Sequence, residues 1–529
     1  MTTEPAAGSR PNIVLIVTDQ HRSDHAGFGG NRIVRTPRLD RLAGAGTRFT
    51  SAYAANPVCM PNRATILTGR MPSAHGTRFN GISLDRDANT FVRELRRAGY
   101  RTGLVGKAHF QNMGHGAGAL EVARRAWPVR AAVAPRYEDG WDLLENDERH
   151  RESDVELPDD FYGFGHVELA IGHGDVVSGH YLRWLVAHGL DPTAVQGPQN
   201  SAERYAPWWQ VWRPTLPEEL YPTHWVGERA MAFIGEAARS AAPFFLQVSF
   251  PDPHHPFTPP GRYHDMYDPA DTELPPTFAD DHATSMPHLQ ALRARRGERP
   301  PRHPAQPFAP TEEILRTATA KEYGSITCID GAIGAILDAL EAAAVADRTV
   351  VIFTSDHAEM FGDHGLMLKG AMHYRPALRV PLLVRDPRRP SQPAVVDSLV
   401  GSIDLAQTLL ALAGLDAYAG MQGHSLLPML DDPSLSVRNA ILVEEDEPFD
   451  LARTGSPLRM RTLITRRARL TLYAGTERGE LFDVVDDPDE LCNRWSDAGA
   501  RALRGELCER LASAMMAADD AGMLPSSFA

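Results

Sequence analysis

Short, continuous apolar runs that alternate with helix-forming segments are the feature that most constrains how this chain can fold. Residues 12–18 (NIVLIVT) form an almost unbroken apolar, β-branched run, which is typical of a strand covered on both faces. Further strands are predicted at residues 100–105, 244–250, 349–354 and 380–384. Buried strands separated by helices predict an α/β fold, in which a mostly parallel sheet is sandwiched by helices.

The segments between these strands carry helix start and stop signals. Pro37, Pro61 and Thr90 stand where helices are expected to begin, and Gly44 and Gly99 stand where two of them are expected to end. Besides the helix that begins at Pro37, the predicted helices cover residues 61–68, 91–98, 225–238 and 312–343.

The pattern changes after residue 440. Strands of mixed polarity are predicted at residues 441–445, 459–465, 470–473 and 481–485, followed by a last helix at residues 500–516. This order predicts a small antiparallel sheet with one helix. We therefore expect a large α/β domain over residues 1–425 and a small C-terminal α+β domain over residues 426–529.

Two irregular segments interrupt the pattern. Residues 274–310 are rich in Pro and Arg and show no periodicity, which predicts a long surface excursion. Another excursion contains Trp208, Trp209 and Trp212. These rings either pack that excursion onto the domain or form a wall of an active-site pocket.

The composition excludes several functional classes. The 529-residue chain has a net charge of −14, which argues against a nucleic-acid partner, since affinity for phosphate backbones comes from clustered Lys and Arg. Its apolar runs fall far short of the roughly 20 residues of a membrane span, so we expect no membrane partner. The N-terminal segment lacks the basic stretch of a secretory signal, and four scattered cysteines are too few for a disulfide framework. We therefore expect a cytoplasmic protein.

Polar side chains follow four of the predicted strands. They are Asp19 and Gln20, Lys107 and His109, Asp252 to His255, and Asp356 with His357. Ligands of open parallel sheets bind beyond the carboxyl ends of the strands. A single such residue is commonly a helix cap or a turn residue, but four sets at one edge predict a site that combines carboxylates, imidazoles and an ammonium group.

Lysine is scarce in this chain. Lys107, Lys321 and Lys369 are the only lysines among 54 basic residues. A compact ammonium group retained against this bias indicates a role that a guanidinium cannot fill, although chance retention is the simpler explanation for any one site. Lys321 lies on a predicted helix, where we expect it to face solvent.

The segment around Cys59 is the most specific motif. Pro61 suits the first turn of a helix, so Cys59 is placed at its positive N-terminal end, and Arg63 projects to the same side. This spacing predicts an anion site that contains a sulfur atom. An unmodified thiol at this position is expected to ionise to a reactive thiolate.

Cys59-x-Pro61-x-Arg63, followed by Thr68-Gly69-Arg70, resembles the signature of the sulfatase family, whose Cys is oxidised to formylglycine. Residues 99–109 (GYRTGLVGKAH) look like the second sulfatase signature, and the resemblance extends over most of the chain. Further similar segments are residues 36–43, 253–256, 369–381 and 481–488. Departures from the family pattern occur at Met60, Asn62, Ala108 and Arg375. The resemblance implies the alkaline phosphatase-like fold.

The resemblance also implies a metal site. Its ligands would be Asp19, Gln20, Asp356, His357 and the hydrated formylglycine at position 59. A set of oxygen ligands favours Ca²⁺, and the imidazole of His357 leaves Mn²⁺ as the alternative.

Catalytic roles follow from the same resemblance. Arg63 would stabilise charge on the nucleophile, Lys107 and Lys369 would hold the sulfate oxygens, and Asn80 would contact the substrate. His254, with Lys369, would protonate the leaving alcohol, and His109 would help to restore the aldehyde. The implied partners are a small-molecule sulfate ester and a formylglycine-generating enzyme.

Two alternatives remain beside sulfate ester hydrolysis. A phosphonate monoester or phosphodiester hydrolase could use the same fold and the same modified Cys. Resemblance to that group would imply neutral, hydroxyl-bearing residues at positions 107 and 109. This chain has Lys107 and His109 there, so the sequence favours a sulfate ester. The second alternative is a non-catalytic anion-binding protein in which Cys59 remains a thiol. The sequence predicts neither the alcohol that carries the sulfate nor an oligomeric state.

Overall fold

The computed structural model describes residues 10–114, 136–389, 394–447, 450 and 457–524. Its centre is a nine-stranded sheet with the strand order β12-β2-β11-β10-β1-β9-β4-β5-β6. The central strands are β1 (Asn12–Thr18), β4 (Arg101–Gly106), β5 (His166–Ile171), β9 (Phe244–Ser249) and β10 (Thr349–Ser355). These five strands pair in parallel. Their carboxyl ends therefore lie at one edge of the sheet.

Antiparallel strands flank this parallel centre. β11 (Leu382–Arg385) runs antiparallel to β10 and to β2 (Thr47–Phe49), and β6 (Ser178–Gly179) runs antiparallel to β5. β12 (Ala394–Val396) closes one edge. The predicted mostly parallel sheet is confirmed.

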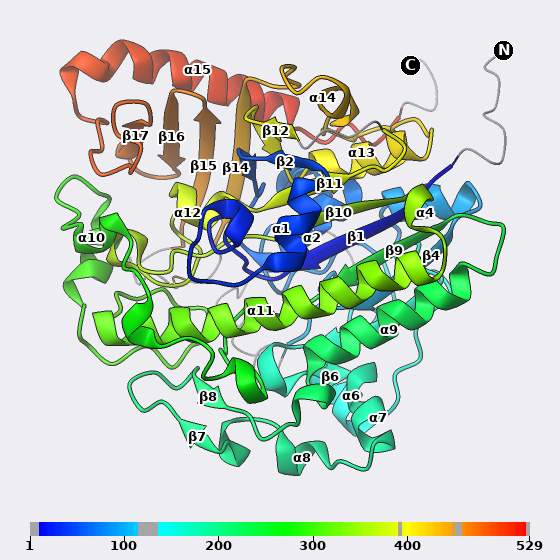
Figure 1. Ribbon diagram of the computed structural model, residues 1–529. Helices are drawn as coiled ribbons and strands as arrows, with labels where there is room; N and C mark the ends of the chain where they lie inside the picture. Colours follow the sequence, from blue (N-terminus) through cyan, green and yellow to red (C-terminus); the bar gives the residue numbers. More distant parts are fainter. Residues whose placement is uncertain (1–9, 115–135, 390–393, 448–449, 451–456, 525–529) are drawn as a thin grey trace, which may run out of the picture.

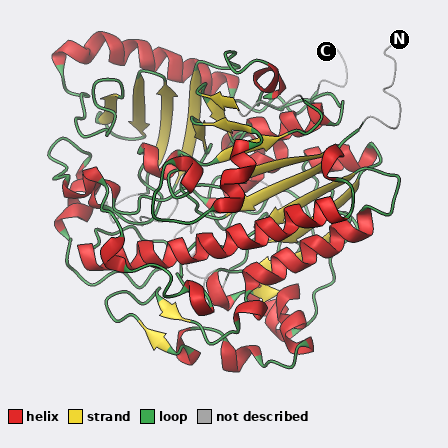
Figure 2. Ribbon diagram, in the orientation of Figure 1, coloured by secondary structure: helices red, strands yellow, loops and turns green. Residues whose placement is uncertain are grey.

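Helices cover both faces of the sheet (Figure 2). Successive side chains of β1 point to opposite faces: Val14 and Ile16 pack with α1 (Pro37–Gly44), α9 (Pro222–Ala237) and α11 (Glu312–Ala342). Ile13, Leu15 and Val17 pack on the other side with α2 (Cys59–Thr68), α4 (Phe91–Arg97) and α13 (Asp404–Leu412). The uninterrupted apolar run of β1 is thus explained by burial on both faces.

α11 crosses the front of the molecule beside α9 (Figure 1). Among the described residues it is the one helix long and apolar enough to cross a membrane, judged by length and composition alone. Ile329, Ile333 and Ile336 are fully buried in the cluster that α11 shares with α9 and the sheet. Its apolar face is therefore used in the core.

The C-terminal part forms a separate antiparallel sheet, at the top of Figure 1. It contains β14 (Ala440–Asp446), β15 (Arg459–Thr465), β16 (Ala468–Tyr473) and β17 (Gly479–Asp483) in sequence order. Leu507 and Leu511 of α15 (Arg501–Ala517) pack against this sheet. The predicted small sheet with one helix is confirmed, whereas the boundary at residue 425 stays a prediction.

The segment of residues 274–310 differs from the expected surface excursion. It contains α10 (Pro287–Ala294), whose Leu289 and Leu292 are buried in a cluster with Met372 and Tyr374. Two apolar residues three apart are too weak a signal beside so many Pro and Arg residues, which explains the error.

The aromatic excursion also packs inward. Trp208 is buried against Phe257 and Phe308, whereas Trp209 is 41% exposed. The ring of Trp208 lies 6.4 Å from that of His255. Trp208 therefore packs its segment onto the domain, as the first interpretation predicted. It also lies beside His255, which follows β9.

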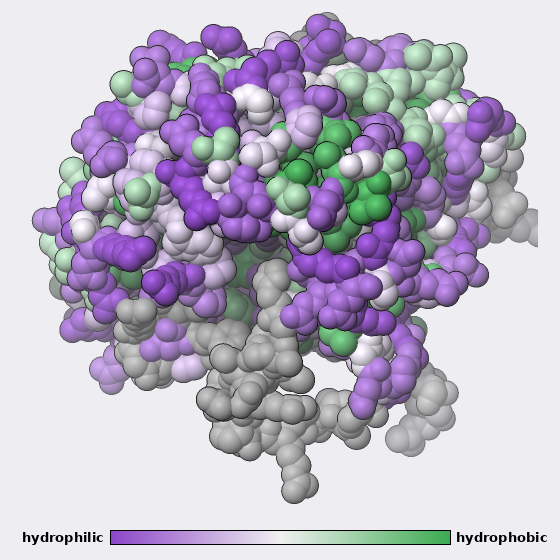
Figure 3. Space-filling view, turned by 90° about the horizontal axis from the view of Figure 1, so that it is seen from below, coloured by the Kyte–Doolittle hydropathy of each residue, from purple (hydrophilic) through white to green (hydrophobic). Residues whose placement is uncertain are grey.

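The remaining described helices and strands are short. Those elements are β3 (Ala52–Tyr53), β7 (Glu203–Arg204), β8 (Trp212–Arg213), β13 (Val400–Gly401), α3 (Pro72–His75), α6 (Asp147–Glu152), α7 (His180–Ala187), α8 (Pro192–Val195), α12 (Arg375–Leu378) and α14 (Leu427–Asp431). The face shown in Figure 3 is mostly hydrophilic, with apolar residues gathered near its middle.

Candidate active site

Helix α2 begins at Cys59, two residues before the predicted start at Pro61. The side chain of Asn80 accepts a hydrogen bond from the Met60 amide at 3.0 Å, and that of Asn56 accepts one from the Val58 amide at 2.7 Å. These side-chain acceptors satisfy backbone donors around the start of the helix. Asn80 thus has a structural role here, and its predicted substrate contact stays a prediction.

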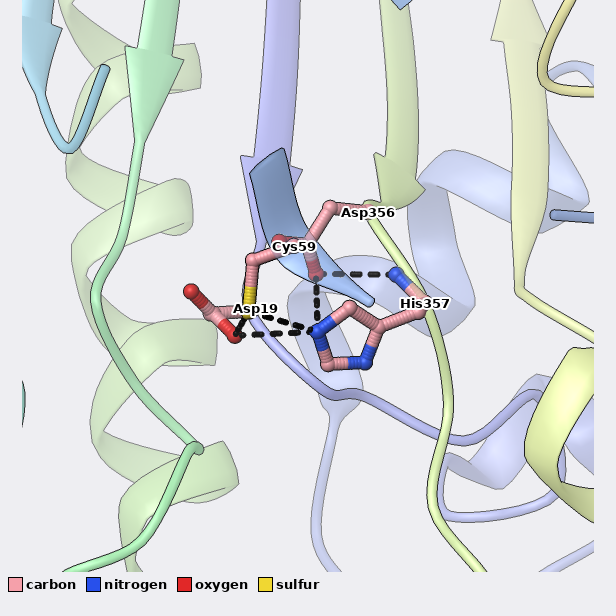
Figure 4. A group of neighbouring side chains, drawn as sticks. All are labelled: Asp19, Cys59, Asp356 and His357. Carbon is pink, nitrogen blue, oxygen red and sulfur yellow. Dashed lines mark hydrogen bonds and ion pairs between the residues drawn. The ribbon is translucent and has the colours of Figure 1, made fainter. Parts of the chain in front are cut away.

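Four buried side chains converge at the ends of β1 and β10 (Figure 4). The two strands are in parallel register, with Thr18 opposite Ser355, so Asp19 and Asp356 leave the sheet side by side. Cys59 and His357 complete the group, and one potential ligand atom of each residue lies within 4.8 Å of the others. The sequence prediction that these residues meet is confirmed by their positions.

The chemistry of this group fits a divalent metal. The Cys59 sulfur lies 3.0 Å from Nε2 of His357 and 4.0 Å from Oδ1 of Asp19. The same His357 nitrogen lies 3.7 Å from a carboxylate oxygen of Asp19 and of Asp356. Burial lowers the pKa of His357 to about 4, which keeps its imidazole neutral and able to coordinate a cation.

Gln20, the remaining predicted ligand, is held beside this group. Its Nε2 donates to Oε2 of Glu359 at 2.8 Å, and its Oε1 accepts a hydrogen bond from Lys369. The amide oxygen therefore faces Lys369 in this arrangement. Its role as a metal ligand stays a prediction.

Arg63 binds both carboxylates of the group. Its Nε donates to Asp356 at 2.7 Å, and its Nη2 lies 3.2 Å from Asp19. Burial alone would raise the pKa of Asp19, but Lys107 and Arg63 hold it well below its usual range. Asp19 is therefore ionised, which a cation ligand requires.

The predicted thiolate at Cys59 is wrong. Burial raises the pKa of this thiol to about 11, and Asp19 adds to the rise, whereas Lys369 and Lys107 oppose it. The positive end of α2 does not compensate for loss of water and a neighbouring carboxylate. An unmodified Cys59 is thus a protonated thiol at neutral pH.

Two of the three lysines of the chain lie beside this group. Lys107 is fully buried and pairs with Asp19, and its Nζ lies 2.6 Å from Nε2 of His173. Nζ of Lys369 lies 2.7 Å from Nε2 of His254. The structure therefore brings together Lys107 and His254, which follow predicted strands, and Lys369, which the family resemblance implied.

His109 is buried near the same lysine. Burial, followed by the charges of Lys107 and Arg63, holds the pKa of His109 well below its usual range. Its Nδ1 has no hydrogen-bond partner among the described residues. The imidazole of His109 is therefore neutral, and its unsatisfied nitrogen can form a hydrogen bond with a ligand.

Lys321 does not face solvent as expected. Its Nζ donates to the carbonyl oxygen of His264 at 2.5 Å and lies 3.7 Å from Asp265. Its side chain is 12% exposed. This third lysine is therefore a packed residue of α11, which contacts His264 and Asp265 rather than the polar set at the strand ends.

Sequence reasoning missed two residues of the site. His173 follows β5 at the same edge of the sheet, but residues 166–171 were not predicted as a strand, so the strand-end rule was not applied to them. Glu359 is buried and positions Gln20. Glu359 follows His357 by two residues, so its closeness in sequence to two predicted metal ligands could have identified it.

Comparison with known proteins identifies the family. Residues 11–415 match the Sulfatase family. The chain belongs to the sulfatase family. Residues 362–517 also match the family described as N-sulphoglucosamine sulphohydrolase, C-terminal. Membership makes the chain a sulfuric ester hydrolase.

Relatives of this sulfatase span nearly its whole length. An arylsulfatase from Clostridium perfringens is 30% identical over 505 residues, which cover 92% of this chain and 90% of the relative. The phosphonate monoester hydrolase of Agrobacterium radiobacter is 27% identical, with a TM-score of 0.76 and 96% of each chain covered. A phosphonate monoester hydrolase from Silicibacter pomeroyi is 25% identical, with a TM-score of 0.78 and 97% and 96% of the two chains covered. The expected alkaline phosphatase-like fold is confirmed.

Proposed function

We propose that this sulfatase cleaves sulfate esters with a formylglycine derived from Cys59 as its nucleophile. The observation that carries the proposal is the position of Cys59 at the start of α2, beside Asp19, Asp356 and His357. A protonated thiol is a poor nucleophile and a poor ligand for a hard cation. When present, the aldehyde hydrate supplies one hydroxyl to attack sulfur and another to release sulfate.

The proposed metal is Ca²⁺, with Mn²⁺ as the alternative. Asp19, Asp356 and His357 would hold it, together with Gln20 and the oxygen-bearing side chain at position 59. Carboxylate and amide oxygens suit Ca²⁺, and an imidazole is compatible with Mn²⁺. When bound, such a cation stabilises negative charge on the nucleophile and the sulfate oxygens.

Three cationic side chains would bind the sulfate group. Arg63, Lys107 and Lys369 border the four-residue group, and each can donate to an oxygen that carries negative charge. Arg63 keeps its guanidinium fixed between Asp19 and Asp356. Donors fixed in this way need little rearrangement as charge develops.

Lys369 and His254 would supply the proton for the leaving alcohol. Nδ1 of His254 bonds the carbonyl oxygen of His255 and must donate, so its Nε2 is the acceptor that faces Lys369. Burial, with the neighbouring His173 and His255, holds the pKa of His254 well below its usual range. The proton therefore resides on Lys369, and His254 orients it. His109 would take the proton when the aldehyde is restored.

The test of this proposal begins with residue 59. After co-expression with a formylglycine-generating enzyme, the peptide that contains residue 59 should lack a free thiol and react with a carbonyl probe. Turnover of an aryl sulfate should rise with the converted fraction. Full activity in wholly unconverted protein, or in Cys59→Ala, would contradict the proposal. A residue 59 that remains a thiol, together with no turnover of any sulfate ester, would favour the non-catalytic anion-binding protein.

Phosphonate monoester hydrolysis is the second candidate, because solved hydrolases of that class share the fold over nearly the whole chain. Lys107→Met keeps much of the side-chain volume but removes the charge, so kcat/KM for an aryl sulfate should fall by roughly 10² to 10⁴. Phenyl phosphonate should be affected less, because its ester substituent replaces a charged oxygen. Arg299→Met, at an exposed arginine, serves as the control. A larger loss with phosphonate would favour the second candidate.

A further inference from the structure

Three imidazole rings form a continuous stack at the active site. The ring centroids of His173 and His254 are 3.8 Å apart, with 17° between the planes, and those of His254 and His255 are 3.9 Å apart, with 32° between the planes. His254 and His255 are buried, and the side chain of His173 is 20% exposed. His173 is therefore the outermost ring of the stack.

Each of two neighbouring rings accepts a hydrogen bond from a different lysine. Lys107 faces Nε2 of His173 at 2.6 Å, and Lys369 faces Nε2 of His254 at 2.7 Å. An ammonium group has three donors and no acceptor, so both imidazole nitrogens must be acceptors. Lys107 also bonds Asp19, and Lys369 also bonds Gln20. These contacts leave one N–H of each lysine for a ligand.

The stack therefore sets the spacing between the two ammonium groups. Asp19, His173 and His254 have potential ligand atoms within 4.8 Å of one another, as a cation site would require. The ammonium groups already occupy the two imidazole nitrogens, and like charges repel. The arrangement suits an anion rather than a second cation.

The turn that carries His173 is pressed against the loop of the other two rings. Gly172 has φ 104° and Gly174 has φ 56°, conformations that favour glycine. A Cβ atom at Gly174 would lie 2.7 Å from Oγ1 of Thr258 and 2.9 Å from the carbonyl oxygen of Pro256. This close contact holds the His173 ring at its stacking distance from the His254 ring.

We infer that His173 is a positioning residue, which aims the free N–H of Lys107 at a sulfate oxygen and holds His254 in place for Lys369. The inference rests on the proposed sulfate hydrolysis and adds a residue to it. His173 has two separable parts: a nitrogen that accepts from Lys107 and a flat ring that stacks on His254. Different substitutions remove one part and keep the other.

His173→Phe keeps a flat ring and removes the acceptor. Lys107 would then bind sulfate less well in both the ground state and the transition state, so KM for an aryl sulfate should rise about 10- to 100-fold, with kcat within about threefold. His173→Asn keeps an acceptor and removes the stacking ring. It should leave KM within about threefold and lower kcat about 10- to 100-fold, with a larger loss for a poor leaving group than for nitrophenol.

His188→Phe is the matched control. His188 is an exposed residue at the end of α7, and its ring centroid lies 4.1 Å from that of Trp184. The control therefore makes the same substitution at an imidazole that also contacts another ring. Both of its kinetic constants should stay within about twofold of wild type. If His173→Phe matches this control, or if the Phe and Asn variants change KM and kcat alike, the inference is overturned.

Sulfate binding provides a readout that needs no turnover. Inorganic sulfate should bind full-length His173→Phe at least about tenfold more weakly than wild type in calorimetric titration, while His173→Asn stays within about threefold. Wild-type protein that hydrolyses no sulfate ester would contradict the proposed function, yet this titration would still decide the role of His173. Equal affinity in wild type and His173→Phe would overturn the inference alone.

Discussion

Asp19 is the residue on which the interactions of the site converge. It accepts hydrogen bonds from Arg63 and Lys107, lies 3.7 Å from His357, and is fully buried. Asp19→Asn keeps the shape and removes the charge, so a divalent metal loses a hard anionic ligand. We expect loss of bound metal in elemental analysis and at least about a 10³-fold lower kcat.

Asp356→Asn should act in the same way, because its carboxylate shares Arg63 with Asp19. Asp338→Asn is the control: this carboxylate is 65% exposed and lies 3.6 Å from Arg38. If chelation and both active-site substitutions leave turnover within about tenfold of wild type, the strand ends do not hold a functional metal.

Glu145 makes stability depend on pH. Burial raises its pKa to about 7, although the amide groups of Gln111, Phe110 and His109 bond the carboxylate and lower it. Because the pKa of Glu145 in the folded state lies above its ordinary value of 4.5, its contribution to stability is complete below pH 4.5 and is lost as the pH rises through 7. The difference amounts to roughly 3 kcal/mol.

Glu145→Gln should remove this dependence. Thermal unfolding at pH 5 and pH 8 should show a smaller loss of stability on raising the pH in the variant than in wild type. Glu148→Gln, at an exposed position of α6, should behave as wild type. Parallel pH profiles for wild type and Glu145→Gln would contradict the prediction.

Individual site residues were predictable where a recognised strand led to them. Asp19, Asp356 and Lys107 each follow a strand that the sequence predicted, so the strand-end rule found them. His173 was missed because the polar residues His166 and Glu168 interrupt the apolar residues of β5, so this segment was not predicted as a strand. The protonation of Cys59 was wrong because sequence shows the helix start but not the depth of burial, and burial decides the pKa.

At the scale of elements, strand β14 supports two catalytic segments from the C-terminal sheet. The carbonyl oxygen of Glu444 accepts a hydrogen bond from Asn56 at 2.6 Å, close to Cys59. The side chain of Glu445 accepts one from the Ala371 amide at 3.0 Å and lies 3.0 Å from His373. Through these contacts, β14 fixes both the segment before Cys59 and the loop that carries Lys369.

Glu445→Ala should therefore impair catalysis from outside the active site. Without its buried carboxylate, the Lys369 loop loses an amide partner, and we expect kcat/KM for an aryl sulfate to fall about 10- to 100-fold. Glu445→Gln keeps an acceptor for Ala371 and should lose less. Glu509→Ala, at an exposed position of α15, should stay within about twofold. Equal losses in the Ala and Gln variants would argue against positioning through Ala371.

Element types were more predictable than pairings. The apolar run at residues 380–384 predicted the strand that the structure places at Leu382–Arg385, but a run has no direction, and β11 proved antiparallel to β10. α10 was missed because two buried leucines lie among Pro and Arg residues that favour a loop. The local sequence indicates which residues are buried and whether their spacing fits a helix or a strand. The direction of a strand in the sheet is instead set by tertiary packing.

At the scale of the whole molecule, the catalytic part and the C-terminal sheet share apolar cores. One cluster combines Met360, Met372 and Tyr374 with Met460 and Phe482. Another combines Tyr53, Leu378 and Leu399 with Ile441, Val443 and Ile464 of the C-terminal sheet. Surfaces that bury each other in this way are expected to unfold together, because separating them would expose apolar area on both sides.

The full-length protein should therefore unfold in one calorimetric transition, with equal calorimetric and van't Hoff enthalpies. Met460→Ala removes a fully buried side chain from the shared cluster and should destabilise the whole molecule by about 2–5 kcal/mol. The single transition should move to lower temperature without splitting, whereas Met516→Ala, at a side chain that is 69% exposed, should not move it. Two transitions, of which Met460→Ala shifts only one, would instead show that the predicted boundary at residue 425 separates independently folding domains.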